Sequence, residues 1–382
     1  MLEKKQTKEM SHIVGTFLVS ANGAFLNGAG IDTSGEDRTS VIPKQFSNGK
    51  YRVPYVSAQA WRRWLRDTLI EETEWPKSTL HAIKQSERGT TSKIAGELNP
   101  IDYPEDDLFG YMRSEEGQGR TKKAEEESSG EEESSGEETQ QRIKVKALIR
   151  ASPFMSSILV SLRKFGWKGK DEGFVHLEEG TPVPYSTVFY NTNLQAIFGL
   201  DMTRAGVFRN VGDRIELREE LIKPGTESGK LKEREKDIYE LSDSNAAKIR
   251  AGELLHAISI LRGGAKQAAF ATDVSPKVLI LAGLDCGNLI LNNIFEDNPD
   301  QASHDGPNIK VETLKEIAAD YADRLVTPIY IGIRKGYLNL ENEKTIRTLA
   351  NGDSRFVVDT PINITKAFVS KHLGYDRDKT AQ

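Results

Sequence analysis

The sequence predicts an α+β protein whose elements follow the order strand, helix, strand, strand, helix, strand. Three observations indicate this class. Short runs of β-branched and aromatic residues alternate with two stretches whose apolar residues recur at helical spacing. Segments rich in glycine, proline and charge separate these runs. A hydrophobic fraction of 37% over 382 residues is enough for one large core or two modest ones.

The first part of the chain predicts a strand, a long loop and a helix. Residues 12–20 read HIVGTFLVS, which is typical of a buried strand. Residues 22–40 contain so much Gly, Asn, Asp and Ser that we expect a long loop. A short strand-like run at 51–55 leads into a helix from Ser57, a suitable N-cap, to about Thr73.

This first helix carries two kinds of side chain. Its apolar residues recur at helical spacing and predict a core face: Trp61, Trp64, Leu65 and Leu69. Arg62, Arg63 and Arg66 lie mostly off that face, where they are free to meet a ligand. Cationic side chains and free N–H groups at a helix start suit a polyanion such as RNA. The alternative is an ordinary amphipathic helix with a solvated basic face.

The middle of the chain is charged and poor in helix-forming patterns. We expect an inserted subdomain over residues 74–141, ending in an acidic tract at 124–138 that holds eight Glu in fifteen positions. Such a tract buries too little apolar surface to offset its chain entropy, so it should be disordered and solvating. It outweighs the whole formal charge of −5, and the remainder is slightly basic. Residues 143–149 then alternate as a half-buried strand does.

Basic and aromatic residues are interleaved with glycine in the irregular section 152–187, notably Phe165, Trp167 and Lys168. This composition fits a protruding hairpin able to stack on bases, or a loop whose rings pack down onto the protein. Residues 187–200 follow as a strand region broken near Asn193.

The last third predicts a second helix and further strands. Residues 223–240 are charged and read as an exposed connection, and a helix follows from Ser244 to about residue 261. Strands are expected at 278–282 and 328–333, with a helix at 311–325 between them.

This element order is the ferredoxin-like βαββαβ arrangement that RNA-recognition modules share. Both helices of such a domain pack on one face of the sheet, so segments attached to them can converge. The loop after the second helix contains Gly263 and Gly264, which permit close backbone approach to a ligand, followed by Lys266 and Gln267. We therefore expect this loop to lie opposite the first helix as a second grip.

Several site classes are disfavoured by the sequence. Six histidines at no ligand spacing and a single cysteine, Cys286, predict no metal site and no cofactor. The lone cysteine and the absence of a signal peptide or membrane span lead us to expect a cytoplasmic protein. Gly28-Ala29-Gly30 lacks the third glycine of a dinucleotide loop, and 225–231 is one residue too short for a P-loop.

Three segments together resemble a known family. They are RVPYVSAQAWRRWLR at 52–66, YNTNLQAIFGLDMTRAGVF at 190–208 and RGGAKQAAFATDVSPKVLIL at 262–281. In this order they resemble the backbone subunits of type I CRISPR effector (Cascade) complexes, the Cas-seven group and its DevR-like branch. The resemblance spans most of the chain from His12 to Ala282.

The resemblance implies a hand-shaped, non-catalytic subunit with a ferredoxin-like palm, inserted fingers and a thumb hairpin. Copies of it assemble along the spacer of a CRISPR RNA, with other effector subunits, and present the RNA for pairing with target DNA. By motif position, Ser57, Gln59, Arg62, Arg63 and Arg66 would grip the RNA backbone together with Lys266 and Gln267. Phe165, Trp167 and Lys168 would be the base-displacing residues of the thumb.

The corresponding division places the first part of the palm at 1–72 and the fingers insertion at 73–142. A palm strand follows at 143–161, the thumb region at 162–186, the rest of the palm at 187–290 and a C-terminal extension at 291–382.

Two other functions stay open. Related backbone subunits of type III complexes cleave target RNA with an aspartate in the loop after the first strand, and Asp32 occupies a comparable place. The structural reading of Asp32 is a turn-forming residue beside Thr33 and Ser34. The third possibility is a general single-stranded RNA-binding protein unconnected with CRISPR.

Overall fold

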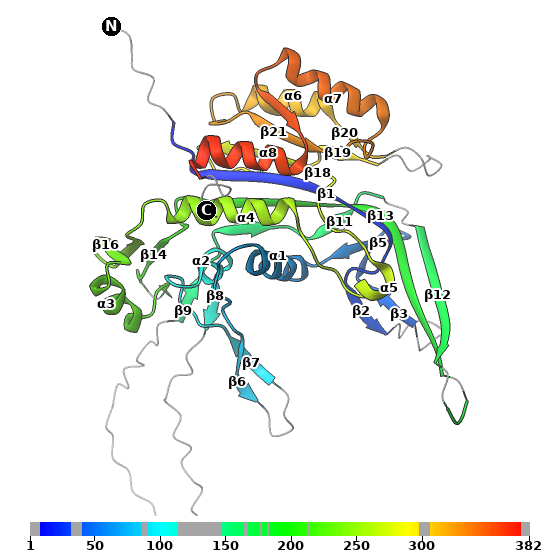
Figure 1. Cartoon of the computed structure of the whole chain (residues 1–382), viewed down its shortest axis with the longest axis horizontal. Coiled ribbons are helices and arrows are strands. Elements are labelled where there is room, and N and C mark those ends of the chain that lie inside the picture. The colour runs from blue at the N-terminus through cyan, green and yellow to red at the C-terminus, as the bar shows by residue number, and fades with distance from the viewer. Residues whose placement is uncertain are drawn as a thin grey trace, which may run out of the picture. The chain divides into compact units, whose positions relative to one another are not determined.

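The structure is a computed structural model that describes residues 8–31, 40–85, 91–113, 147–163, 167–175, 178–181, 183–212, 214–297 and 306–375. These residues form a mixed α+β fold with a large mixed sheet and eight α-helices (Figure 1). The chain divides into two compact units. The first comprises Met1–Pro76, Pro153–Ala205 and Asn245–Gln382, and the second comprises Lys77–Ser152 and Gly206–Ser244.

The first unit contains the large sheet and six of the helices. Its described strands are β1 (His12–Ala24), β2 (Gly28–Ile31), β3 (Ser40–Pro43), β4 (Gln45–Asn48), β5 (Tyr51–Val56), β10 (Phe154–Ser156), β11 (Leu159–Ser161), β12 (Trp167–Val175), β13 (Val183–Asp201), β18 (Val278–Leu284), β19 (Phe295–Glu296), β20 (Asn308–Ile309), β21 (Ile329–Ile333) and β22 (Phe356–Asp359). Its helices are α1 (Ala58–Glu72), α4 (Ala246–Ser259), α5 (Gln267–Phe270), α6 (Val311–Asp320), α7 (Leu340–Gly352) and α8 (Pro361–Phe368), with a π-helical turn at Val369–Leu373.

The large sheet is built around β1. Its main path runs β22-β21-β18-β1-β13-β11-β5-β4. β1 is antiparallel to both neighbours, with Ile13 opposite Leu200 of β13 and Gly283 of β18, and β11 is antiparallel to β13. β12 and β13 run side by side as a long antiparallel hairpin (Figure 1).

Alternate residues of β1 serve two separate cores, because successive side chains of a strand point to opposite faces. Phe17 lies on the face that α1 covers, where its ring meets Trp61 edge-on with centroids 5.6 Å apart. Trp61 also contacts Phe154 of β10 and is fully buried. These contacts fix α1 against the sheet.

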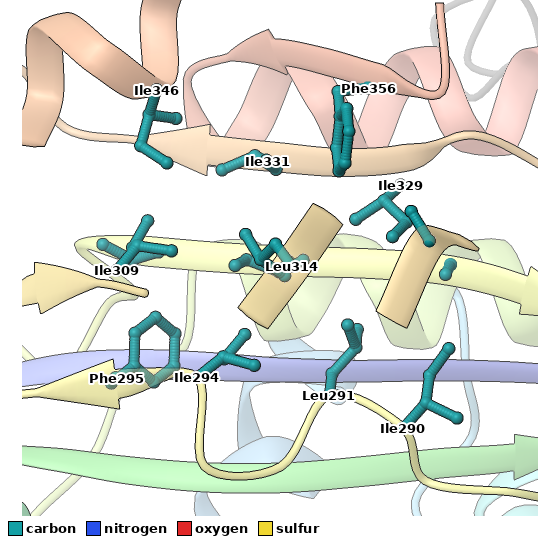
Figure 2. Packing of buried hydrophobic residues seen from close by; sticks show 14 of the residues in the cluster. Ile290, Leu291, Ile294, Phe295, Ile309, Leu314, Ile329, Ile331, Ile346 and Phe356 are labelled. Carbon is teal, nitrogen blue, oxygen red and sulfur yellow. The ribbon is translucent and has the colours of Figure 1, made fainter. Parts of the chain in front are cut away.

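Val14 and Leu18 belong to the opposite face and to a large apolar cluster. Figure 2 shows Ile290, Leu291, Ile294 and Phe295 from the segment after β18 lying over the sheet, with Leu314 of α6 beside them. All seven residues of β18 are buried, as expected for a strand covered on both faces.

The second unit has its own elements and a separate small core. Its described elements are β6 (His81–Gln85), β7 (Thr91–Ala95), α2 (Pro104–Phe109), β8 (Tyr111–Arg113), β9 (Ala147–Arg150), β14 (Val207–Arg209), β15 (Arg214–Ile215), α3 (Glu219–Glu227), β16 (Leu231–Glu235) and β17 (Ile238–Leu241). Ile101, Phe208, Leu217 and Leu231 form the apolar cluster. Beside it, the buried Arg150 guanidinium binds the carboxylates of Asp107 and Glu216.

The two predicted helices of the βαββαβ pattern are confirmed. Helix α1 begins after Ser57 and ends before Thr73, as the sequence predicts. Helix α4 occupies the second predicted position, but its N-cap is Asn245 rather than Ser244. In the C-terminal part, the strand predicted at 328–333 is β21 and the helix predicted at 311–325 is the shorter α6.

Three local predictions are wrong. Residues 22–40 are not all loop, because β1 continues to Ala24 through a register shift after Ala21 and β2 follows. The strand at 187–200 has no break at Asn193, whose buried side chain is bonded to Asp297 and Tyr337. The charged stretch 223–240 contains most of α3, all of β16 and most of β17.

No helix among the described residues is long and apolar enough to span a membrane.

Candidate nucleic-acid interface

The start of α1 is capped by Ser57 and bonded to the turn that follows β1. Ser57 caps the helix in an extended conformation, and its Oγ accepts from the Ala60 N–H at 3.4 Å. The Ser57 N–H donates to Oδ1 of Asn27, in the turn between β1 and β2, at 3.0 Å. Gln59 is exposed on the first turn. The positive end of the helix dipole therefore lies beside one exposed polar side chain, that of Gln59.

Arg62 is less available than its sequence position predicts. It is half-buried, and its Nη1 donates to the Phe154 carbonyl oxygen at 2.8 Å and to Ser156 Oγ at 3.2 Å. Burial, together with the charge of Arg66, lowers the pKa of Arg62 to about 10, so it remains charged at neutral pH. The expectation that Arg62 is free to meet a ligand is therefore wrong. Its guanidinium joins α1 to β10 and adds positive charge to the site, but it does not extend toward a ligand.

Arg63 is the exposed cation of the group. Its Nε donates to Oδ2 of Asp67, one helical turn on, at 2.9 Å, and 49% of its side chain remains exposed. An exposed pair at this spacing contributes only about 0.3–0.5 kcal/mol, so a phosphate can compete for the guanidinium. Arg66 is half-buried and acts electrostatically on Arg62.

The glycines of the 261–272 loop allow it to lie directly on α1 and on the turn that follows β1. Gly263 has φ +142°, and a Cβ at this position would overlap the ring of Trp64. Gly264 has φ +111°, and a Cβ there would overlap Leu26 and Gln267. The Arg262 N–H donates to Thr68 Oγ1 at 3.1 Å, and the Ala265 N–H to the Leu26 carbonyl at 2.9 Å. The structure thus brings α1 and this loop together.

Lys266 and Gln267 occupy different environments within the loop. Lys266 is exposed in the left-handed region, with φ +52°. Its Nζ lies 5.1 Å from the centroid of the Phe25 ring and donates to Thr187 Oγ1 of β13 at 2.6 Å. The Gln267 side-chain amide donates to the carbonyls of Gly263 and Thr272. Gln267 therefore holds the loop in shape, and Lys266 is the residue that presents a charge.

The remaining predicted site residues are Asp32, Phe165, Trp167 and Lys168. Asp32 and Phe165 are outside the described residues. Trp167 and Lys168 begin β12, opposite Asn191 and Tyr190 of β13, in the long hairpin rather than beside α1.

Sequence reasoning missed two residues that shape the interface. Asn27 orients the helix start, but it lies in a stretch expected to be irregular. Thr187, on β13, accepts a hydrogen bond from Lys266, which is distant from it in the chain. Only the tertiary fold shows such pairings. The FLNG sequence at 25–28, just after β1, is a local signal for the position of Asn27, because Asn before Gly favours a turn.

In the segment from β3 to Arg66 of α1, every charged residue is a Lys or an Arg. Residues 40–66 include six cations, Lys44, Lys50, Arg52, Arg62, Arg63 and Arg66, and no acidic residue before Asp67. Within the described residues, no group of three or more His, Cys, Asp and Glu side chains is placed to hold a metal ion.

Comparison with known proteins gives a likeness of fold. No protein-family model matches the chain, and no curated protein does. The solved structure "CRISPR RNA-guided surveillance complex" matches with a TM-score of 0.45 and 11% identity, covering 94% of this chain and 98% of the matched chain. The structure "CRISPR RNA-guided surveillance complex, pre-nicking" matches with a TM-score of 0.50 and 11% identity, covering 94% and 100%. At this identity the second likeness shows a shared fold alone.

Proposed function

We propose that this chain is a CRISPR RNA-binding backbone subunit of the Cas-seven type. In this function, copies of the chain assemble along the spacer of the guide RNA in a type I surveillance complex. Together with other effector subunits they present the RNA to target DNA. The observation that carries the proposal is the meeting of α1 with the 261–272 loop, which places Arg63 and Lys266 as exposed cations on two adjoining segments.

The topology of the first unit supports a ferredoxin-like palm. In a βαββαβ palm the four strands lie in the order fourth, first, third, second, and all neighbours are antiparallel. The strands β18-β1-β13-β11 have that order and those directions. Along the chain, α1 follows β1 and precedes β11, and α4 follows β13 and precedes β18. On this interpretation the β12–β13 hairpin is the thumb and the second unit is the fingers. The fold shared with a chain of a "CRISPR RNA-guided surveillance complex" is compatible with it.

The chemistry of the interface fits recognition of a backbone rather than of bases. A subunit that holds any spacer must use contacts that are independent of sequence, and phosphate contacts by Lys and Arg have that property. Ser57 and Gln59 add neutral donors at the helix start. The overall charge of −5 does not oppose this function, because the charge of the binding surface decides the local field.

The clamp, meaning Arg63 and Lys266 with the segments that carry them, can be tested by the salt dependence of RNA binding. We expect full-length protein carrying Arg63→Ala and Lys266→Ala to bind CRISPR RNA more weakly. Its slope of log affinity against log salt should fall by about 1.4, since each lost phosphate contact with a single strand removes about 0.7. Lys344→Ala is the matched control. Lys344 is exposed on α7 and paired with Glu341 as Arg63 is paired with Asp67. An unchanged slope in the double variant would show that the clamp is assigned wrongly.

We also propose that the subunit does not itself cut RNA. Incubating the assembled complex with complementary RNA and Mg²⁺ should leave that RNA intact. Regularly spaced cuts that disappear in Asp32→Asn would instead establish the endoribonuclease function.

A further inference from the structure

The β4–β5 hairpin has an exposed aromatic surface that the clamp does not use. The two strands form one end of the main path of the large sheet, with Phe46 opposite Val53 and Asn48 opposite Tyr51. Because side chains alternate along a strand, Phe46, Val53, Tyr51 and Tyr55 share one face. Ser47 and Arg52, which are bonded to each other at 3.0 Å, lie on the other.

The aromatic residues on this face surround one apolar residue, Val53. Val53 is buried, whereas Phe46 keeps 39% of its surface exposed. The Phe46 and Tyr55 ring centroids are 5.9 Å apart with the planes inclined by 54°. Tyr51 and Tyr55 are half-buried. The exposed part of the Phe46 ring is available for another planar group to cover.

Cations stand at both ends of these rings. Lys50, in the turn of the hairpin, is exposed and places its Nζ 5.3 Å from the centroid of the Tyr51 ring. Lys44 lies opposite Tyr55, whose N–H donates to the Lys44 carbonyl at 3.0 Å, and by alternation its side chain is on the Phe46 face. No acidic residue occurs anywhere in 40–66. Aromatic rings between cations are the combination that binds single-stranded nucleic acid without sequence preference.

We propose that this face of the β4–β5 hairpin is a stacking surface for single-stranded nucleic acid. Bases stack on Phe46 and Tyr55, and the neighbouring phosphates lie against Lys44 and Lys50. The inference rests on the proposed function and extends it, because Val56 at the end of β5 is joined directly to Ser57 of the clamp. The surface therefore lengthens the RNA track beyond the start of α1.

The test compares two oligonucleotide probes, oligouridine and an abasic strand of equal length, binding to full-length protein. Both carry the same phosphates, but only oligouridine has bases. Wild-type protein should bind oligouridine more tightly. Phe46→Ala and Phe46→Leu should weaken oligouridine binding about tenfold while leaving the abasic strand unaffected, since one base loses its stacking partner. Phe46→Leu keeps the apolar contact with Tyr55 and removes only the ring.

The lysines give an independent readout. Lys44→Ser with Lys50→Ser should lower the salt slope by about 1.4 for both probes. Arg52→Ser, on the opposite face of the same hairpin, should leave the slope unchanged. For the Phe46 variants, Leu340→Ala is the matched control for loss of an exposed apolar side chain.

The outcomes separate the two proposals. If wild-type protein binds both probes and the Phe46 variants bind oligouridine normally, the stacking surface is refuted and the clamp stands. The stacking surface is also refuted if wild-type protein binds the two probes equally well. If wild-type protein binds neither probe nor CRISPR RNA, the proposed function fails and the stacking surface fails with it.

Discussion

Arg150 in the second unit and the cations Arg63 and Lys266 in the first unit serve opposite purposes. In the second unit Arg150 is fully buried and binds Asp107 and Glu216, with further hydrogen bonds from its guanidinium to the carbonyl oxygens of Asp107 and Val207. In the first unit Arg63 and Lys266 are exposed residues, with one exposed carboxylate and one hydroxyl as their described polar partners. Burial and the number of partners therefore distinguish a cation that stabilises the fold from one that can bind a ligand.

The largest expected effect is on Arg150. Replacing it with Ala leaves Asp107 buried without its ion pair, which typically costs about 3–5 kcal/mol. All four tryptophans lie in the first unit, so fluorescence does not report this change. Amide hydrogen exchange should instead show loss of protection in α2 and β9. Arg214→Ala, an exposed change in the same unit, is the control. Normal protection in Arg150→Ala would contradict the structural role.

Gly263 should show the next largest effect, and it links stability to the interface. Gly263→Ala combines a strained positive φ with an overlap against Trp64, and strain of this kind costs about 1–3 kcal/mol before the overlap is added. We expect lower thermal stability and weaker RNA binding. Gly336→Ala has a positive φ of 77° but open space around it, so it should cost less stability and leave RNA binding unchanged. Equal effects of the two changes would show that contact with Trp64 is unimportant.

His372 gives the smallest expected effect and an intermediate case, a partly buried group that titrates. Tyr330 Oη is 2.8 Å from His372 Nε2, and burial, followed by the charge of Lys371, lowers the pKa of His372. A lowered histidine pKa means that the unfolded chain binds the proton more tightly than the folded chain. Stability therefore falls as the pH drops through the ordinary histidine pKa of about 6.5 and below.

Amide protection factors in α8, which are corrected for the intrinsic pH dependence of exchange, should consequently be lower at pH 5 than at pH 7. His372→Gln should abolish the part of this pH dependence that arises from the histidine. If the variant and the wild-type protein respond identically to pH, a lowered pKa of His372 does not contribute to the pH dependence of stability.

The sequence predicted the helices that support the interface better than the interface itself. Helix α1 lies within a residue of its predicted bounds at each end, because Ser57 is a standard cap and the apolar spacing is regular. The meeting of α1 with the 261–272 loop followed from element order and from the two glycines. Local sequence did not reveal that Arg62 would bind the Phe154 carbonyl, because this depends on a strand about ninety residues later.

Polar composition was the main source of error in the fold. Asn22 and Gly23 led to the prediction of a loop where β1 in fact continues to Ala24. At this point Gly23 has φ +56° and the pairing with β13 shifts register. Asn193 resembles a strand break by local rules, yet inside the fold its amide donates to Asp297 and accepts from Tyr337. Such residues are tolerated in strands when tertiary partners satisfy them, and those partners are invisible to local patterns.

The central claim is that the chain holds CRISPR RNA, and the RNA carried by the native protein tests it most directly. Protein purified from its own cells should contain RNA of uniform length with constant repeat-derived ends and variable spacer sequence between them. The Arg63→Ala and Lys266→Ala double variant should contain much less of it. Recovery of no RNA, or of cellular RNA without repeat-derived ends, would contradict the claim.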